Sequence, residues 1–194
     1  AQDDAVAAQV DGVAGVGLDA DRVVGRGHEA RRGLQQAVTV LPAVRQAVTA
    51  LQEMDMHREV QLIVSGGIRS GADVAKAIAM GADAVSIGTA ALIAIGCNNP
   101  RYESDYQKMG TSWGYYDEYQ AGQDPAGITT QEPELEKRLD PVRAGHQLAN
   151  YLRVLTLEAQ TLARACGKSH LHRLEPEDLC ATTVEAAAMA GVPL

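Results

Sequence analysis

The sequence predicts an α/β fold with a parallel sheet, and two observations support that prediction. Two short, nearly continuous apolar runs of strand length, residues 60–64 and 84–87, are each followed within two residues by glycine. Segments with the three- and four-residue spacing of amphipathic helices precede, separate and follow these runs. Helices that alternate with strands over short connections are typical of parallel α/β folds.

The first predicted helix covers residues 42–54. Pro42 suits a first helical turn, where its missing N–H is not needed. Apolar residues at helical spacing predict one buried stripe: Val44, Ala47, Val48, Leu51 and Met54. The strand predicted at residues 60–64 has little polar alternation, which favours a strand covered on both faces.

A second helix is predicted for residues 72–80, ended by Gly81 and with three residues facing inward: Val74, Ala77 and Ile78. Asp73 is expected to support its first turn. The second strand, residues 84–87, then leads into an apolar segment at residues 90–95.

The remainder of the chain is predicted to be a long loop and two helices. The loop runs from Cys97 to about residue 140 and contains most of the aromatic side chains: Tyr102, Tyr106, Trp113, Tyr115, Tyr116 and Tyr119. A long helix ended by Gly167 is predicted from an apolar stripe: Leu148, Leu152, Leu155, Ala159, Leu162 and Cys166. A last helix is predicted to begin near residues 175–178 and to stop before Gly191.

Residues 1–40 use few residue types and have neither strand nor helix periodicity, so no element is assigned to them. We therefore divide the chain into an unassigned segment, residues 1–40, and a regular domain, residues 41–194. A segment that differs this much in composition is expected not to be native to the domain that follows it.

The charge and cysteine content exclude several classes of function. A formal net charge of −8 repels phosphate backbones and anionic lipids, which argues against nucleic-acid binding and membrane-surface roles. No apolar run reaches the roughly 18 residues needed to cross a bilayer, so a cytoplasmic protein is expected. Three widely spaced cysteines predict neither disulfides nor a zinc site, and Cys166 and Cys180 are expected to pack as small hydrophobes.

Two glycine loops are the candidate binding site. Ser65, Gly66 and Gly67 follow the first strand and precede a helix, whose N-terminus would add donors for an anion. Gly88 and Thr89 follow the second strand one helix later, and two such loops form the usual phosphate site of (β/α) barrels.

The pattern allows another role for the glycines and two roles for Arg69. The glycines could serve only to end helices and turn the chain. Arg69 could be a charge partner of the phosphate or a solvated surface residue.

Residues 60–96, especially the segments 61–71 and 81–92, resemble the last two strands of the FMN-binding domain of glutamate synthase. Residues 124–131 and the chain beyond them resemble the stand-alone branch of that family. The resemblance implies an α/β fold that is the C-terminal part of a (β/α)8 TIM barrel, followed by a long loop and C-terminal helices. It also implies FMN held by its phosphate through backbone groups of Gly66, Gly67, Gly88 and Thr89. With Ser65 and Arg69 added from their place in the first loop, the candidate cofactor-binding set is Ser65, Gly66, Gly67, Arg69, Gly88 and Thr89.

The same resemblance implies an oxidoreductase acting on CH–NH2 donors in glutamate biosynthesis. Its substrates would be 2-oxoglutarate with glutamine or ammonia, and its partners other glutamate synthase subunits or further copies of the chain. No general acid or base is assigned. Because the strands that hold the flavin ring are not recognisable, we expect the chain alone to bind flavin weakly.

Relatives in the family hold a 3Fe-4S cluster through three cysteines. Cys97 matches the first position, Asp124 stands at the last, and no cysteine matches the middle one. Since iron–sulfur ligation needs thiolates, we expect Cys97 to be a plain buried thiol.

Two other functions remain possible. One is a non-catalytic phosphate-ligand or assembly module derived from the barrel, which would dock through the aromatic loop and the C-terminal helices. The other is a nucleotide or sugar-phosphate barrel of isomerase or dehydrogenase type.

Overall fold

The structure, a computed structural model, describes residues 13–16 and 29–194. Most of the segment without a predicted element, residues 1–40, lies outside the described residues. The chain divides into two compact units, residues 1–87 with 155–194 and residues 88–154. Each unit has a hydrophobic core cluster of its own.

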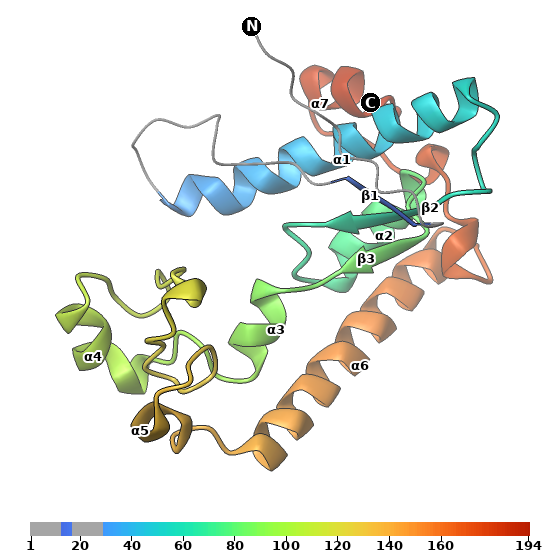
Figure 1. Ribbon diagram of the computed structural model, residues 1–194. Helices are drawn as coiled ribbons and strands as arrows, with labels where there is room; N and C mark the ends of the chain where they lie inside the picture. The colour runs from blue at the N-terminus through green and yellow to red at the C-terminus, as the bar shows by residue number, and fades with distance from the viewer. Residues whose placement is uncertain (1–12, 17–28) are drawn as a thin grey trace, which may run out of the picture. The chain divides into compact units, whose positions relative to one another are not determined.

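The first unit contains a three-stranded parallel sheet (Figure 1). Its strands are β1 (Val13–Val16), β2 (Gln61–Ser65) and β3 (Ala84–Ser86), in that order across the sheet. Ser65 pairs with Ser86, so β2 and β3 end level with each other. Both predicted strands and their parallel arrangement are confirmed.

Burial in β2 is one-sided. Leu62 and Val64, which share one face, are each 2% exposed, whereas Ile63 on the other face is only half-buried. In β3, Ala84 and Ser86 are exposed. The expectation of a strand covered on both faces is therefore wrong for this chain, because only one face of β2 is fully buried.

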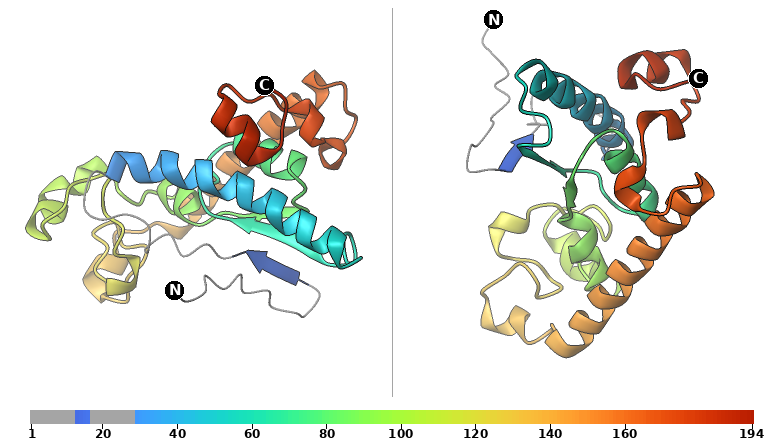
Figure 2. Two further views of the ribbon diagram at one scale, coloured as in Figure 1. Left: turned by 90° about the horizontal axis from the view of Figure 1, so that it is seen from above. Right: turned by 90° about the vertical axis from the view of Figure 1, so that its right-hand side faces the viewer.

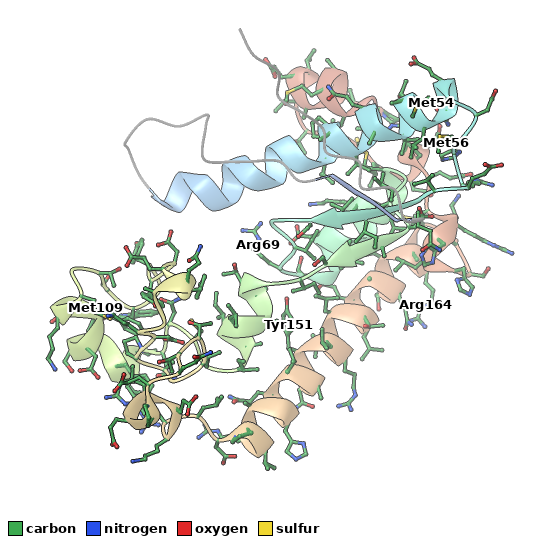
Figure 3. All side chains as sticks on the ribbon, in the orientation of Figure 1. Met54, Met56, Arg69, Met109, Tyr151 and Arg164 are labelled. Carbon is green, nitrogen blue, oxygen red and sulfur yellow. The ribbon has the colours of Figure 1, made fainter. Side chains whose placement is uncertain are left out.

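Helix α1 (Glu29–Glu53) begins earlier than the sequence predicts, and Pro42 lies inside it. Its buried stripe is confirmed at Val44, Val48 and Leu51. Met54 lies just beyond the helix and is 58% exposed, so its predicted burial is wrong (Figure 3). The stripe ends where the helix ends.

Helix α2 (Gly71–Ala79) follows the first glycine loop and agrees closely with the prediction. Ser70 caps it, and the three predicted inward residues are buried: Val74, Ala77 and Ile78. Gly81, with a φ of 110°, follows its C-terminal end.

Helix α2 packs directly against the long helix α6 (Pro141–Ala165), whose last part belongs to the first unit. Gly71 allows this approach, because a Cβ there would lie 2.4 Å from the Leu155 carbonyl oxygen. Gly167, with a φ of 73°, follows the end of α6 as predicted.

The predicted stripe of α6 is only partly buried. Leu155 and Ala159 are buried, whereas Leu152 and Leu162 are 41% and 37% exposed. Cys166, beyond the helix end, is also exposed. The helix therefore buries a narrower face than the sequence spacing suggests.

The last predicted helix is two elements instead of one. A single 3-10 turn covers Pro176–Asp178, and α7 (Val184–Ala190) begins later, with Thr183 as its N-cap. Both views of Figure 2 show α7 beside α1, which it contacts. The prediction placed the start of the helix too early because Pro176 and its acidic neighbours form a short turn of their own.

The second unit has short helices joined by irregular segments. They are α3 (Thr89–Ala94), a 3-10 turn at Pro100–Tyr102, α4 (Glu103–Lys108), a 3-10 turn at Tyr119–Ala121 and α5 (Pro133–Glu136). The first part of α6 completes the unit. The predicted long aromatic loop is thus confirmed as a largely irregular segment.

Replacing Gly71 with alanine is expected to destabilise the chain. The added Cβ would meet the Leu155 oxygen at 2.4 Å and the Ala159 amide nitrogen at 2.5 Å, so α2 and α6 would have to separate. We expect the free energy of unfolding, measured by urea denaturation, to fall by about 1–3 kcal/mol.

Gly145→Ala is the matched control, since Gly145 is also helical and no atom lies within 4 Å of its added Cβ. It is expected to be neutral or stabilising by about 0.5–1 kcal/mol. Equal effects of the two substitutions would contradict the close-packing role of Gly71.

Candidate functional site

The two glycine loops follow strands that end at the same edge of the sheet. Ser65 closes β2 and pairs in parallel register with Ser86, which closes β3. Gly66, the first residue after β2, is therefore level with Ile87, the first residue after β3, and Gly88 is the next residue of the chain. In (β/α) barrels, loops after neighbouring parallel strands form the usual phosphate site.

The first loop has a backbone conformation that favours glycine. Gly66 has a φ of 107° and Gly67 a φ of 70°, values that residues with a Cβ rarely adopt. Within the described part of the chain, the Gly67 amide donates no hydrogen bond. The loop therefore combines a sharp turn with an amide that is available to a ligand.

The first turn of α2 is already occupied by carboxylates. Asp73 Oδ2 accepts hydrogen bonds from the amides of Arg69 at 3.0 Å and Ser70 at 3.2 Å. The Gly71 amide donates to Glu158 Oε2 at 2.7 Å. Asp73 supports the first turn as expected, and the amides of Arg69, Ser70 and Gly71 are used within the chain. That this helix end adds a donor for an anion stays a prediction.

Arg69 lies directly after the first glycine loop (Figure 3). Its Nε is 3.7 Å from Asp73 Oδ2, and its side chain is 55% exposed. An ion pair this exposed contributes little to stability. Its role as a phosphate partner stays a prediction.

The second loop belongs to the second unit and leads into α3. The Gly88 carbonyl accepts hydrogen bonds from the amides of Ala91 at 2.9 Å and Leu92 at 3.2 Å. No atom of the described chain lies within 4 Å of the position that a Cβ would take at Gly88. The amides of Gly88 and Thr89 donate to no acceptor among the described residues.

A second group of predicted residues lies in the core of the second unit. Cys97, Tyr106 and Tyr116 form a buried cluster, here called the Cys97 cluster, and are 2%, 0% and 3% exposed. The ring centroids of Tyr106 and Tyr116 are 5.6 Å apart. The expectation that Cys97 is a buried thiol is confirmed, and these two tyrosines pack within their own unit.

Asn98 holds the loop that covers the Cys97 cluster. Its Nδ2 donates to the Tyr116 carbonyl at 2.9 Å, and its Oδ1 accepts from the amides of Tyr116 at 3.0 Å and Gly114 at 3.1 Å. Its φ is 56°, in the left-handed region that asparagine tolerates better than most residues. A single buried amide side chain thus satisfies three backbone groups of this loop.

Asp124 likewise forms hydrogen bonds with several backbone groups, those of the turn that follows it. It is fully buried, and its carboxylate accepts hydrogen bonds from the amides of Ala126 at 3.0 Å, Ile128 at 3.3 Å and Thr129 at 3.4 Å. The Tyr106 hydroxyl donates to it at 3.4 Å. The carboxylate therefore organises the turn and links it to the aromatic core.

Burial suppresses ionisation in this core. Desolvation, with the nearby Asp124 charge as a second cause, raises the pKa of Cys97 to about 11. Desolvation also raises the pKa of Tyr116 and of Tyr119 to about 12. At neutral pH Cys97 is therefore a protonated thiol and not a thiolate.

These residues do not fit the iron–sulfur cluster of the family. Cys97 is the single thiol in the core of the second unit, and its raised pKa disfavours the thiolate that iron requires. At the position of the last family cysteine, the Asp124 carboxylate is committed to backbone amides. No step of the proposed function runs through such a cluster.

Cys166 and Cys180 are exposed, so the expectation that they pack as small hydrophobes is wrong. Cys166 follows the end of α6, and Cys180 lies between the 3-10 turn at Pro176–Asp178 and α7. Across residues 13–16 and 29–194, no group of three or more His, Cys, Asp or Glu side chains is arranged to hold a metal ion. In the same residues, no helix combines the length and apolar character needed to cross a membrane.

Sequence reasoning missed the roles of Asn98, Asp124 and Glu158. Asp124 followed by Pro125 was a recognisable turn signal, because aspartate side chains accept hydrogen bonds from amides just ahead of them. Glu158 gave no local signal, since its partner Gly71 lies 87 residues away in the chain.

Replacing Asp124 with asparagine is expected to destabilise the second unit. The substitution keeps the size of the side chain but turns one acceptor oxygen into a donor that faces backbone amides. We expect a loss of about 1–3 kcal/mol in the free energy of unfolding, measured by urea denaturation.

Glu134→Gln is the control, because Glu134 forms an exposed pair with Lys137 and is expected to matter much less. A variant Asp124→Asn as stable as the wild type would show that the carboxylate does not organise the turn.

Stability is expected to fall with rising pH between about 9 and 11. The unfolded chain ionises Cys97 near the ordinary pKa of 9.0, whereas the native chain keeps the proton until its pKa of about 11. Above pH 9 the unfolded state therefore binds fewer protons than the native state, and the free energy of unfolding decreases. Urea denaturation across this pH range measures the slope.

Cys97→Ala should flatten this slope, and the exposed-site variant Cys166→Ala should leave it unchanged. The same slope in all three proteins would rule out Cys97 as its source.

The sequence matches the family described as "Conserved region in glutamate synthase" over residues 27–104 and 117–169. A "Glutamate synthase large subunit-like protein" of Rhizobium meliloti is 73% identical over 154 residues, which cover 79% of this chain and 35% of that protein. An archaeal glutamate synthase of Methanocaldococcus jannaschii, whose name specifies NADPH, is 38% identical over 163 residues, or 80% of this chain and 29% of its own length.

A more distant relative is the "Pre-mycofactocin synthase" of Mycolicibacterium smegmatis, which is 29% identical over 177 residues, 91% of this chain and 31% of that protein. The chain thus spans about a third of the length of these curated relatives. Because the family match covers more than half of the chain, this protein belongs to the glutamate synthase family.

Proposed function

We propose that residues 41–194 are the C-terminal part of a (β/α)8 TIM barrel that binds the phosphate of FMN in a glutamate synthase-type oxidoreductase. The observation that carries this proposal is the parallel register of β2 and β3, which end level with each other and are each followed by a glycine loop. Family membership supports the oxidoreductase class.

Backbone amides supply most of the proposed phosphate site. Amides beside a dianionic group form charge-assisted hydrogen bonds, which are stronger than those between neutral groups. The loop conformation at Gly67 and the open space at Gly88 support this use. The proposed ligand set is Ser65, Gly66, Gly67, Gly88 and Thr89, with the Arg69 side chain as a charge partner.

The bound FMN would supply the electron transfer, and this chain would hold and orient its phosphate end. The proposed reaction forms glutamate from 2-oxoglutarate with nitrogen from glutamine or ammonia, in the cytoplasm. The amides of Arg69, Ser70 and Gly71 take no part, because Asp73 and Glu158 already accept hydrogen bonds from them.

Exposed apolar side chains on α6 support docking to a further protein surface. Val142, Val154 and Leu157 are 72%, 63% and 51% exposed. Other strands of the barrel, other synthase subunits or a second copy of the chain would cover them. The same observation favours the second candidate function, a non-catalytic phosphate-ligand or assembly module.

The chain is expected to bind FMN more tightly than riboflavin, which lacks the phosphate. Both flavins are expected to bind weakly. Because of hydrogen bonds to the charged phosphate, the dissociation constant of FMN should be lower than that of riboflavin by about tenfold or more. Quenching of flavin fluorescence during titration with the 194-residue chain measures both constants.

Gly67→Ala is expected to abolish the difference between the two flavins, because alanine disfavours a φ of 70° and would reshape the loop. Gly110→Ala is the matched control, since Gly110 has a φ of 80° in a loop that contributes no residue to the proposed site, and no described atom lies within 4 Å of its added Cβ. Equal affinity of the wild type for FMN and riboflavin would disprove the phosphate site.

A further inference from the structure

A small pocket of about 90 Å³ lies wholly within the second unit. It is formed by the segment after α3, the segment after α5 and the start of α6. Its lining includes the polar side chains Asn99, Arg101, Arg138, Arg143 and Gln147. Three arginines thus converge on one pocket in a chain whose formal net charge is −8.

Two of the arginines share one aromatic ring. The guanidinium carbons of Arg101 and Arg138 lie 5.0 Å and 5.1 Å from the ring centroid of Tyr102. Cation–π contacts with this one ring hold both guanidinium groups beside the pocket.

The remaining guanidinium donors are only partly used. Arg138 Nη1 donates to Asp105 Oδ2 and to the Pro125 carbonyl, both at 2.8 Å. The Arg143 side chain forms no hydrogen bond or ion pair with any described residue. The other guanidinium donors of Arg138 and those of Arg143 are therefore available to a bound group.

The nearby carboxylates do not neutralise the pocket. Asp140 Oδ1 accepts hydrogen bonds from the backbone amides of Val142 at 3.0 Å and Arg143 at 3.1 Å, and so caps α6. Asp105 is shared between Arg138 and Lys108. Asp140 lines the pocket and Asp105 pairs with Arg138, so three guanidinium groups face two carboxylates and the group keeps a net charge of 3 − 2 = +1.

We propose that this pocket binds a small oxyanion, the phosphate or carboxylate group of a soluble metabolite. The planar donor fork of arginine matches the paired oxygens of both groups. The volume is that of about three water molecules, which suits one such group and not a whole nucleotide. None of the residues proposed to hold the FMN phosphate lines this pocket.

The test is an NMR titration of the 194-residue chain that follows the side-chain Nε–H signals of its arginines. One arm uses inorganic phosphate and the other malonate, at constant ionic strength. The signals of Arg101, Arg138 and Arg143 are expected to shift together and to saturate with one dissociation constant. Saturation with phosphate alone, malonate alone or both supports the proposal and identifies the source of the oxyanion.

Arg143→Gln is expected to weaken binding by about tenfold, because it removes a charged donor without shortening the side chain greatly. Arg153→Gln is the matched control on the same helix; its guanidinium bonds to Asn150 outside the pocket, and the affinity should not change. Shifts that never saturate, or equal affinities of Arg143→Gln and the wild type, would overturn the proposal. Gly67→Ala should leave this binding intact, which separates it from the FMN site.

Discussion

The parallel backbone ladder between β2 and β3 is the constraint on which the proposed site depends. Its register pairs Ser65 with Ser86, so the chain leaves both strands at the same edge of the sheet. An antiparallel pairing would send the two glycine loops to opposite edges, and one anion could not then reach both. The proposed use of both glycine loops by one anion requires this common edge.

The helix that follows the first loop shows how local charge limits where an anion can bind. The start of α2 has the amide donors and the dipole of a usual anion site, yet Asp73 and Glu158 fill it. Glu158 reaches it because Gly71 lets α2 and α6 approach closely. Packing and charge thus leave the glycine backbone itself as the available donor set in this loop.

The second unit builds its core from buried aromatic side chains and from hydrogen bonds between side chains and the backbone. The buried thiol of Cys97 lies among tyrosines, and Asn98 and Asp124 satisfy the backbone groups of the surrounding loops. Buried polar groups of this kind stabilise a fold only while every partner is present. The irregular segments of this unit are therefore held together by the hydrogen bonds of Asn98 and Asp124.

Local pattern in the sequence determined the strands β2 and β3, the helix α2 and the glycines that follow the helices, because each depends on neighbouring residues. The burial of Cys97 was expected only from the absence of further cluster cysteines, and its packing against Tyr106 and Tyr116 produces it. The pairing of Glu158 with Gly71, the positions of the three pocket arginines and the real span of α1 were decided by tertiary structure. These features join residues far apart in the chain or override a local signal such as Pro42. Contacts of that kind leave no periodicity in the sequence, because the groups meet only after the elements have packed.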